Sequence, residues 1–301
     1  MIRALVAPAL LGTGTACATP GIDRTAASEG QQCAFRVCIT GLRERRGVSY
    51  LARNDAAVPA TVVIRFRQVT NLGPAYTQPV TRVVAPGERA TLAAMRVVDR
   101  RRRFSAQPVV MIDLGSDSLS HRPTEPYALP FGGTEPRQLS SGFGGPTHLA
   151  ENFYSFDFEM PEGTPVLAAR GGVVVYVQDG FSEGGLFPDL IERANLVAVG
   201  HADGTIASYG HLREGIEVAV GDSVHTGQRL GQSGSTGFSG RPHLHFHVGK
   251  RLMGGSGRTI PVEFAVGGSG PVSLEEGAWY GPAAPRASLR FAPRARSSSG
   301  A

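Results

Sequence analysis

Apolar and polar positions alternate along much of this chain. In the stretch HLHFHV, three histidines (His243, His245 and His247) alternate with leucine, phenylalanine and valine. Successive side chains of a β-strand point to opposite faces, so the pattern predicts a half-buried strand with an apolar face and a face of three imidazoles. The apolar face packs in a core, and the histidine face lines a wet surface. A plain row of surface histidines is the alternative interpretation.

The same alternation recurs in short runs before and after this stretch. VVIRFRQV (62–69) and PVVMIDLG (108–115) are strand candidates, and TRVVAPGERATL (81–92) has Pro86-Gly87 as a turn between two runs. We interpret residues 33–118 as a small β-sandwich. NLVAVGHADGTIASYGHL (195–212) predicts a hairpin with Asp203-Gly204 at its turn.

Few windows show a helical apolar period, so the expected fold class is mainly β. An N-terminal β-sandwich is followed by a connector over 119–147, rich in proline and glycine, and by a second, mostly antiparallel β domain with a groove over 148–266. Residues 267–301 consist largely of Gly, Pro, Ala, Ser and Arg, which predicts a low-complexity, loosely attached tail.

The N-terminus has the features of a signal peptide over residues 1–18. Arg3 precedes an apolar run, and Ala16-Cys17-Ala18 fits the small-x-small rule with cleavage after Ala18. The run is too short to span a bilayer. We therefore expect an exported protein, periplasmic or extracellular. The alternative is a lipoprotein anchored through Cys17, although Gly14 fits poorly where a lipobox has an aliphatic residue.

Cleavage after Ala18 would leave two cysteines, Cys33 and Cys38, either disulfide-bonded in an oxidising compartment or free. The formal net charge is +5, mostly from arginine, which suits an anionic partner such as a wall polymer, lipid head groups or nucleic acid. No base-stacking aromatics are interleaved with the arginines, and an export signal also argues against nucleic acid.

Candidate chemistry gathers in the second domain. Two imidazoles and one carboxylate form a typical three-ligand catalytic zinc set with water in the fourth position. Further imidazoles beside such a set can exchange protons or stabilise an oxyanion. Asp157 lies between two phenylalanines, so partial burial is expected and the carboxylate needs a partner. The candidates are His148, Asp157, His211, His243 and His245.

Several motifs occur in an order that resembles one family. They are a His…Asp pair before PEGTPV, SYGHL, GDSVHTGQ, and a Gly-x-x-Gly turn leading to HLH. With these, residues 148 to about 264 resemble the lysostaphin/LytM-type zinc metalloendopeptidases, which are peptidoglycan hydrolases with the duplicated hybrid motif fold. The resemblance implies a compact β fold with a groove, one Zn²⁺ per domain, and hydrolysis of peptide bonds in peptidoglycan stems or cross-bridges.

Carried over residue by residue, the resemblance implies that His148, Asp157 and His245 bind the metal. His211 and His243 would be the catalytic pair, with their individual roles left open. Two features depart from the common pattern. His148 and Asp157 are nine positions apart instead of four, and His247 stands where Glu or Gln is more frequent. His247 is either a hydrogen-bonding partner of His245 or a residue of the groove edge.

The expected function is that of a zinc peptidase that remodels or lyses the cell wall, with peptidoglycan as its partner. We expect no nucleic-acid partner, and membrane contact only if Cys17 is lipidated. The alternative is a non-catalytic or latent member of the fold that binds wall or regulates another hydrolase. All expected ligands are present, which favours the enzyme. The N-terminal domain would position or inhibit the peptidase domain. Residues 119–147 or the insertion 179–194 would cover the groove in a resting state. The bond cleaved and the oligomeric state are not determined by the sequence.

Overall fold

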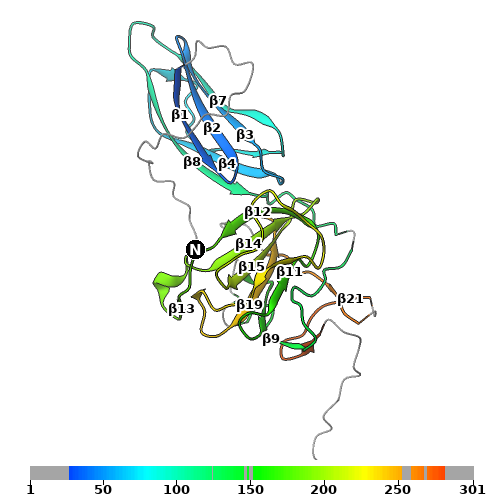
Figure 1. Ribbon diagram of the computed structural model, residues 1–301. Helices are drawn as coiled ribbons and strands as arrows, with labels where there is room; N and C mark the ends of the chain where they lie inside the picture. Colours follow the sequence, from blue (N-terminus) through cyan, green and yellow to red (C-terminus); the bar gives the residue numbers. More distant parts are fainter. Residues whose placement is uncertain are drawn as a thin grey trace, which may run out of the picture.

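The computed structural model describes residues 27–123, 125–145, 148, 152–252, 259–267 and 270–281. Within these residues the protein is built from β-strands and one short 3-10 helix, η2 (Pro188–Leu190), so the expected mainly β class is confirmed (Figure 1). No helix in these ranges is long and apolar enough to cross a membrane. The predicted signal peptide, with Cys17, lies outside the described residues.

The N-terminal part consists of two sheets that share one core. The first has the order β1-β2-β3-β7-β5 and contains β1 (Ala27–Ala34), β2 (Val37–Glu44), β3 (Gly47–Asn54), β7 (Arg89–Val97) and β5 (Leu72–Gly73). The second has the order β6-β4-β8 and contains β6 (Val80–Val84), β4 (Ala60–Thr70) and β8 (Ser105–Leu114). Alternate residues of both sheets, such as Ile39, Tyr50, Val62 and Ile64, are buried in the same cluster, as the period of two requires.

The turn at Pro86-Gly87 carries the chain from one of these sheets to the other. Strand β6 before it pairs with β4, and β7 after it pairs with β3, so the two runs do not form a hairpin. Gly87 has a φ of 74°, a left-handed conformation that glycine adopts without steric cost. Cys33 and Cys38 lie at paired positions of β1 and β2 and are joined by a disulfide, so the disulfide alternative holds in this structure.

The second domain is organised around a sheet with the order β16-β12-β14-β15-β19-β10-β9-β22, paired antiparallel throughout. Its members are β16 (Ser223–Val224), β12 (Gly172–Gln178), β14 (Asn195–Gly200), β15 (Ile206–Leu212), β19 (His243–Gly249), β10 (Ser155–Glu159), β9 (Arg137–Ser141) and β22 (Trp279–Tyr280). Short pairs surround it: β11 (Pro165–Leu167) with β17 (Arg229–Gln232), β13 (Gly184–Gly185) with β18 (Gly237–Phe238), and β20 (Phe264–Ala265) with β21 (Pro271–Val272).

The histidine strand β19 lies between β15 and β10 and alternates as predicted. Leu244, Phe246 and Val248 are fully buried in the domain core, whereas the three histidines are partly exposed on the opposite face. The predicted hairpin over 195–212 is confirmed, since β14 and β15 pair antiparallel around the turn at Asp203-Gly204. A period of two therefore located the histidine strand correctly, and the Asp203-Gly204 turn located the hairpin.

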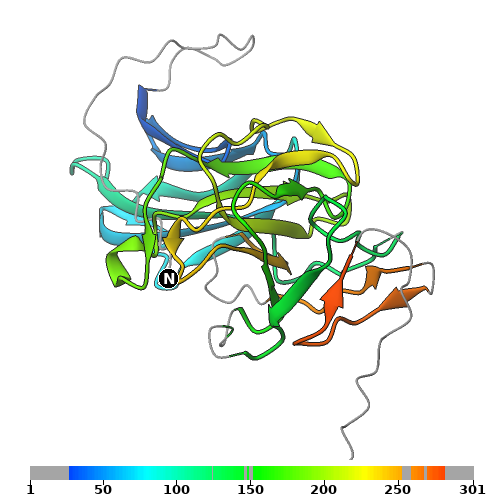
Figure 2. The same ribbon diagram turned by 60° about the horizontal axis from the view of Figure 1, so that its bottom comes forward.

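Three strands, β9, β21 and β22, fall in segments that the sequence analysis assigned to the connector and to the tail. Strand β9 lies within 119–147, and β21 and β22 lie beyond residue 266. Of these, β9 and β22 extend the sheet of the second domain. In Figure 2 the orange C-terminal strands lie beside the green strand β9. Strands of two to five residues carry too few positions for a recognisable period, and their pairing partners are distant in sequence.

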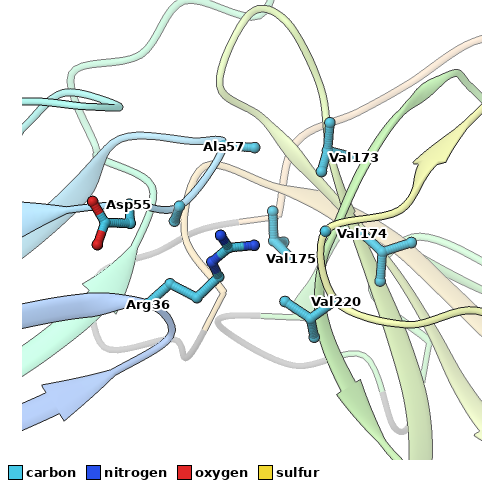
Figure 3. A pocket seen from close by; sticks show the side chains of 9 residues that line it. Arg36, Asp55, Ala57, Val173, Val174, Val175 and Val220 are labelled. Atoms are coloured by element: carbon cyan, nitrogen blue, oxygen red, sulfur yellow. The ribbon is translucent and has the colours of Figure 1, made fainter. Parts of the chain in front are cut away.

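The two domains pack directly against each other. Val175, Ala198 and Ile206 of the second domain are buried with the N-terminal core, and Arg251 pairs with Asp113 at 2.9 Å. A pocket at this junction is lined by Arg36, Asp55, Ala56, Ala57, Val173, Val174, Val175, Val220 and Gly221 (Figure 3). None of the candidate site residues lines it, so it is separate from the histidine strand.

Candidate active site

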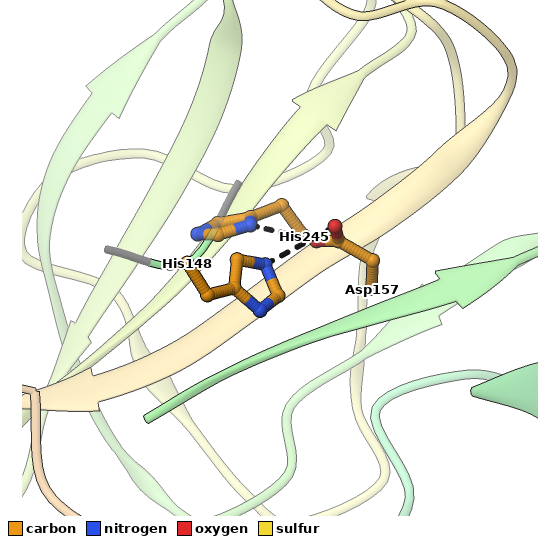
Figure 4. A group of neighbouring side chains, drawn as sticks. All are labelled: His148, Asp157 and His245. Carbon is orange, nitrogen blue, oxygen red and sulfur yellow. Dashed lines mark hydrogen bonds and ion pairs between the residues drawn. The ribbon is translucent and has the colours of Figure 1, made fainter. Parts of the chain in front are cut away.

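The register of β10 against β19 places Asp157 directly opposite His245. Nδ1 of His245 lies 2.8 Å from Oδ1 of Asp157, and Nε2 of His148 lies 3.1 Å from Oδ2 of the same carboxylate (Figure 4). One ligand atom from each of the three residues lies within 4.8 Å of the others. This spacing suits three ligands of a single metal ion, and the structure thus brings His148 to the site in spite of its wide sequence separation from Asp157.

The hydrogen bonds around the two imidazoles define which nitrogens face the carboxylate as acceptors. Nδ1 of His148 donates to the carbonyl oxygen of Gly142 at 2.7 Å, which leaves Nε2 as the acceptor atom. That Nε2 is buried and makes no hydrogen bond. On the other side, Nε2 of His245 lies 3.2 Å from Nδ1 of His247. If His247 accepts there, Nδ1 of His245 also presents a lone pair.

Acceptor atoms that converge at these distances repel one another unless a cation lies between them. Either the imidazoles take up protons or a metal ion binds, and in metal sites the outward nitrogen of each histidine is held by a hydrogen bond of the kind seen here. Burial alone would raise the pKa of Asp157, but the imidazoles of His148 and His245 hold that pKa well below its usual range. The carboxylate is therefore ionised at neutral pH and attracts a cation.

Without a metal ion, the proton is drawn to His148. Burial lowers the pKa of His148, but the adjacent Asp157 carboxylate and the Gly142 carbonyl raise it, and the net shift of this pKa is upward. A metal ion and a proton would compete for the same Nε2 lone pair. The arrangement fits a metal ion better at neutral pH, because one divalent ion satisfies all three acceptors at once.

His211 and His243 lie beside this cluster as a pair. Their ring centroids are 4.6 Å apart, and the ring of His211 is 6.0 Å from that of His245. His211 donates from Nδ1 to the carbonyl oxygen of Thr236 at 2.7 Å, and His243 donates from Nδ1 to that of Arg241 at 2.9 Å. Both rings are thereby fixed in one tautomer, with Nε2 as the free acceptor.

Both rings are neutral at pH 7. Burial lowers the pKa of His211 to about 3, and burial also lowers the pKa of His243 although Asp157 counteracts it. His211 has a φ of 60°, the left-handed region that non-glycine residues rarely adopt. Such strain accumulates at functional positions, where the surrounding structure holds the residue. The two rings can accept a proton next to a cluster that could hold a metal ion.

The remaining histidines are placed elsewhere. His201 is buried and donates from Nδ1 to the carbonyl oxygen of Gly171 at 2.9 Å. His225 lies exposed after β16. The backbone carbonyls of Gly142, Thr236 and Arg241, which fix the tautomers, were not foreseen, because a carbonyl group is present in every residue and leaves no sequence signal.

Part of the insertion 179–194 lies beside the segment that leads into the histidine strand. Its strand β13 pairs in parallel with β18, and a Cβ added at Gly240 would lie 3.4 Å from the side chain of Leu186. Leu186, Phe187 and Phe238 are exposed there. The insertion therefore contributes exposed apolar side chains beside the segment that leads into β19.

The second domain is similar in sequence to known proteins. Residues 151–258 match the sequence model of Peptidase family M23. Lysostaphin of Staphylococcus simulans is 41% identical over 128 residues, 41% of this chain and 24% of its own length. The peptidoglycan DD-endopeptidase ShyA of Vibrio cholerae is 38% identical over 92 residues, 31% of this chain and 19% of its own. The catalytic domain of the prophage-encoded M23 protein EnpA of Enterococcus faecalis is 33% identical, with 45% of this chain and 94% of that chain covered and a TM-score of 0.34.

The second domain is thus a metallopeptidase-type domain with a His, Asp, His cluster. Residues 151–258 of this domain match peptidase family M23, and the domain is similar to lysostaphin. The chain spans between 14% and 25% of the length of such curated relatives. The family match begins after His148, so the position of this residue in the cluster rests on the structure.

Proposed function

We propose that the protein is a zinc metalloendopeptidase that hydrolyses peptide bonds in peptidoglycan stems or cross-bridges. The observation that carries the proposal is the convergence of His148 Nε2, Asp157 and His245 Nδ1, with the neutral imidazoles of His211 and His243 next to them. The match of residues 151–258 to family M23 supports the peptidase class. ShyA, a relative, is named a peptidoglycan DD-endopeptidase, which supports the substrate class.

Two imidazoles and one carboxylate match the ligand preference of Zn²⁺ in catalytic sites. His148 would bind through Nε2 and His245 through Nδ1, because their other ring nitrogens are engaged with Gly142 and His247. The bound ion would polarise the scissile carbonyl and activate water for attack. One ion per domain satisfies the cluster.

The chain's own contribution to the reaction is proton transfer. His211 and His243 each have Nδ1–H committed to a backbone carbonyl, so each can accept a proton only at Nε2. A ring that has taken up a proton there can donate it to the departing amine or to the oxyanion. The two backbone carbonyls stabilise the resulting imidazolium through the Nδ1–H bonds.

We further propose that the protein is exported and acts in the periplasm or outside the cell, where its substrate lies. Residues 1–18 would direct export, and an anchor at Cys17 is the alternative to a freely diffusing protein. The net charge of +5 favours approach to an anionic wall polymer. No nucleic-acid role is needed to account for the basic surface.

The N-terminal domain is proposed to be a positioning module. It packs on Val175, Ala198 and Ile206 of strands β12, β14 and β15, whereas the histidines and Asp157 lie on the next strands of the same sheet, β19 and β10. Packing of this kind fixes the orientation of the catalytic domain relative to a bound wall polymer. An inhibitory role would require a segment over the site, and a truncated second domain that is faster than the full chain would reveal it.

The decisive experiment is the release of soluble muropeptides from purified peptidoglycan by the purified protein. It is run with zinc, after chelation and after zinc is restored, with His211→Ala as the inactive control. The proposal is supported if muropeptide release stops on chelation and returns when zinc is restored. The new amino termini then identify the bond that is cleaved. A zinc-loaded protein that releases nothing from several wall types would instead indicate the latent or regulatory member of the fold.

A further inference from the structure

The C-terminal segment 270–281 packs against strand β9, which precedes His148 in the chain. Strand β22 pairs with β9, and Gly277 and Leu139 are linked by a hydrogen bond of 2.8 Å from the Gly277 N–H to the Leu139 carbonyl. The Leu139 N–H in turn donates to the carbonyl of Ala278 at 3.0 Å. Both β9 and this segment lie outside the residues that match family M23.

From this segment, one carboxylate reaches the turn that follows β9. Oε2 of Glu276 accepts a hydrogen bond of 3.0 Å from the N–H of Gly142. Gly142 is buried, so its N–H needs a partner, and Glu276 provides it. The carbonyl oxygen of the same Gly142 accepts the 2.7 Å hydrogen bond from Nδ1 of His148. Glu276 is thus linked to His148 through a single residue.

Local hydrogen bonds make this turn a compact unit. The N–H of Gly145 donates to the Gly142 carbonyl at 3.3 Å, and the N–H of His148 donates to the Gly145 carbonyl at 2.9 Å. A displacement of Gly142 would therefore move His148 with it. Nε2 of His148 lies 3.1 Å from Asp157, so even a small displacement changes the geometry of the cluster.

We propose that Glu276 is a positioning residue, which holds the 142–145 turn and thereby keeps His148 in place for the metal ion. The inference rests on the metal site of the proposed function and extends it to the C-terminal segment. Outer partners that orient a metal ligand are worth about 10–100-fold in metal affinity. Because Glu276 acts through Gly142, the lower end of this range, about tenfold, is expected.

Three variants of the full chain test the role of Glu276. Glu276→Ala removes the acceptor, Glu276→Gln keeps an oxygen acceptor without the charge, and Glu275→Ala removes the adjacent exposed carboxylate as a matched control. Zinc affinity is measured by competition with a chromophoric chelator. Amide hydrogen exchange of peptides that contain Gly142 is measured on the metal-free protein, so that this readout does not depend on zinc.

Glu276→Ala should weaken zinc binding about tenfold and accelerate exchange at Gly142. Glu276→Gln should retain most of the zinc affinity and of the exchange protection at Gly142. Glu275→Ala should change neither quantity. The proposal is overturned if Glu276→Ala keeps wild-type exchange protection and zinc affinity, or if Glu275→Ala causes an equal loss. A wild-type protein that binds no zinc would contradict the proposed function, and the exchange data would still decide whether Glu276 holds the turn.

Discussion

Asp157 and His245 occupy directly paired positions on the neighbouring strands β10 and β19, with His245 Nδ1 2.8 Å from Asp157 Oδ1. Cross-strand pairs of this kind are fixed by the backbone ladder, so the two side chains meet without help from a flexible loop. The same register places His243 opposite Glu159 and His247 opposite Ser155. The period of two then aligns three imidazoles along one face, of which the central one contacts the carboxylate.

Removal of a metal ligand and removal of a proton acceptor should have different effects. His245→Ala is expected to abolish zinc binding, because a site with only His148 and Asp157 keeps two protein ligands where catalytic zinc sites have three. His211→Ala should retain zinc but lose about 10²–10⁴-fold in turnover, the usual contribution of a general acid or base. Zinc content after dialysis and muropeptide release measure the two effects. Stoichiometric zinc in His245→Ala would contradict the ligand assignment.

His247 should matter through its hydrogen bond to His245. Nδ1 of His247 lies 3.2 Å from Nε2 of His245, so His247→Ala removes the group that fixes this ring. Zinc affinity is expected to fall about 10–100-fold, as for other outer partners of metal-bound histidines. His247→Gln should fall less, since the amide oxygen can accept the same hydrogen bond. Equal affinities of the alanine variant and the wild type would place His247 at the groove edge only.

The stability of the protein should decrease as the pH falls from about 6.5 to 4, in part because of His201. Burial lowers the pKa of this ring to about 4, whereas 6.5 is its ordinary value. The unfolded chain therefore binds the proton first, and the free energy of unfolding decreases through this window by up to about 3 kcal/mol. Above pH 6.5 the contribution of His201 is constant.

Urea unfolding at pH 7, 5 and 4 measures this dependence. His201→Gln keeps a donor for the Gly171 carbonyl but does not titrate, so its free energy of unfolding should depend less on pH than that of the wild type. Parallel curves for the two proteins would show that His201 does not cause the decrease. The comparison is made between proteins because other histidines titrate in the same range.

Arg170 and Asp203 form a buried ion pair that anchors the hairpin turn. Their side chains are 10% and 8% exposed, and Nη1 lies 3.0 Å from Oδ2. Asp203 also accepts hydrogen bonds from Thr205 and from the N–H of Arg122. Asp203→Ala leaves the arginine buried without its partner and should cost about 3–5 kcal/mol of unfolding free energy.

The exposed pair of Glu183 and Arg193 is the matched control. Its atoms lie 3.4 Å apart, with side chains 72% and 51% exposed, so Glu183→Ala should cost less than about 1 kcal/mol. Both variants are compared by urea denaturation at pH 7. Similar losses for the two variants would show that the burial of the Arg170–Asp203 pair does not strengthen its contribution.

Much of the candidate site could be read from local sequence. The alternation over 243–248 predicted the strand, its buried face and its histidine face, because side-chain direction in a strand has a period of two whatever the rest of the chain does. The position of Asp157 between two phenylalanines predicted burial of its strand, and both phenylalanines are fully buried. The hairpin over 195–212 followed from its turn residues.

Other features depended on contacts between distant segments. His148 reaches Asp157 across a separation of nine residues through a turn held by backbone carbonyls and by Glu276, more than a hundred positions away. Strand β22 and strand β9 are too short to show a period, and β6 and β7 joined different sheets although one turn separates them. Side-chain alternation is a local property and can be predicted from the sequence. Backbone hydrogen bonds, in contrast, can be formed by almost every residue, so they leave no such pattern. Which of those groups meet was decided by the packing of the whole chain.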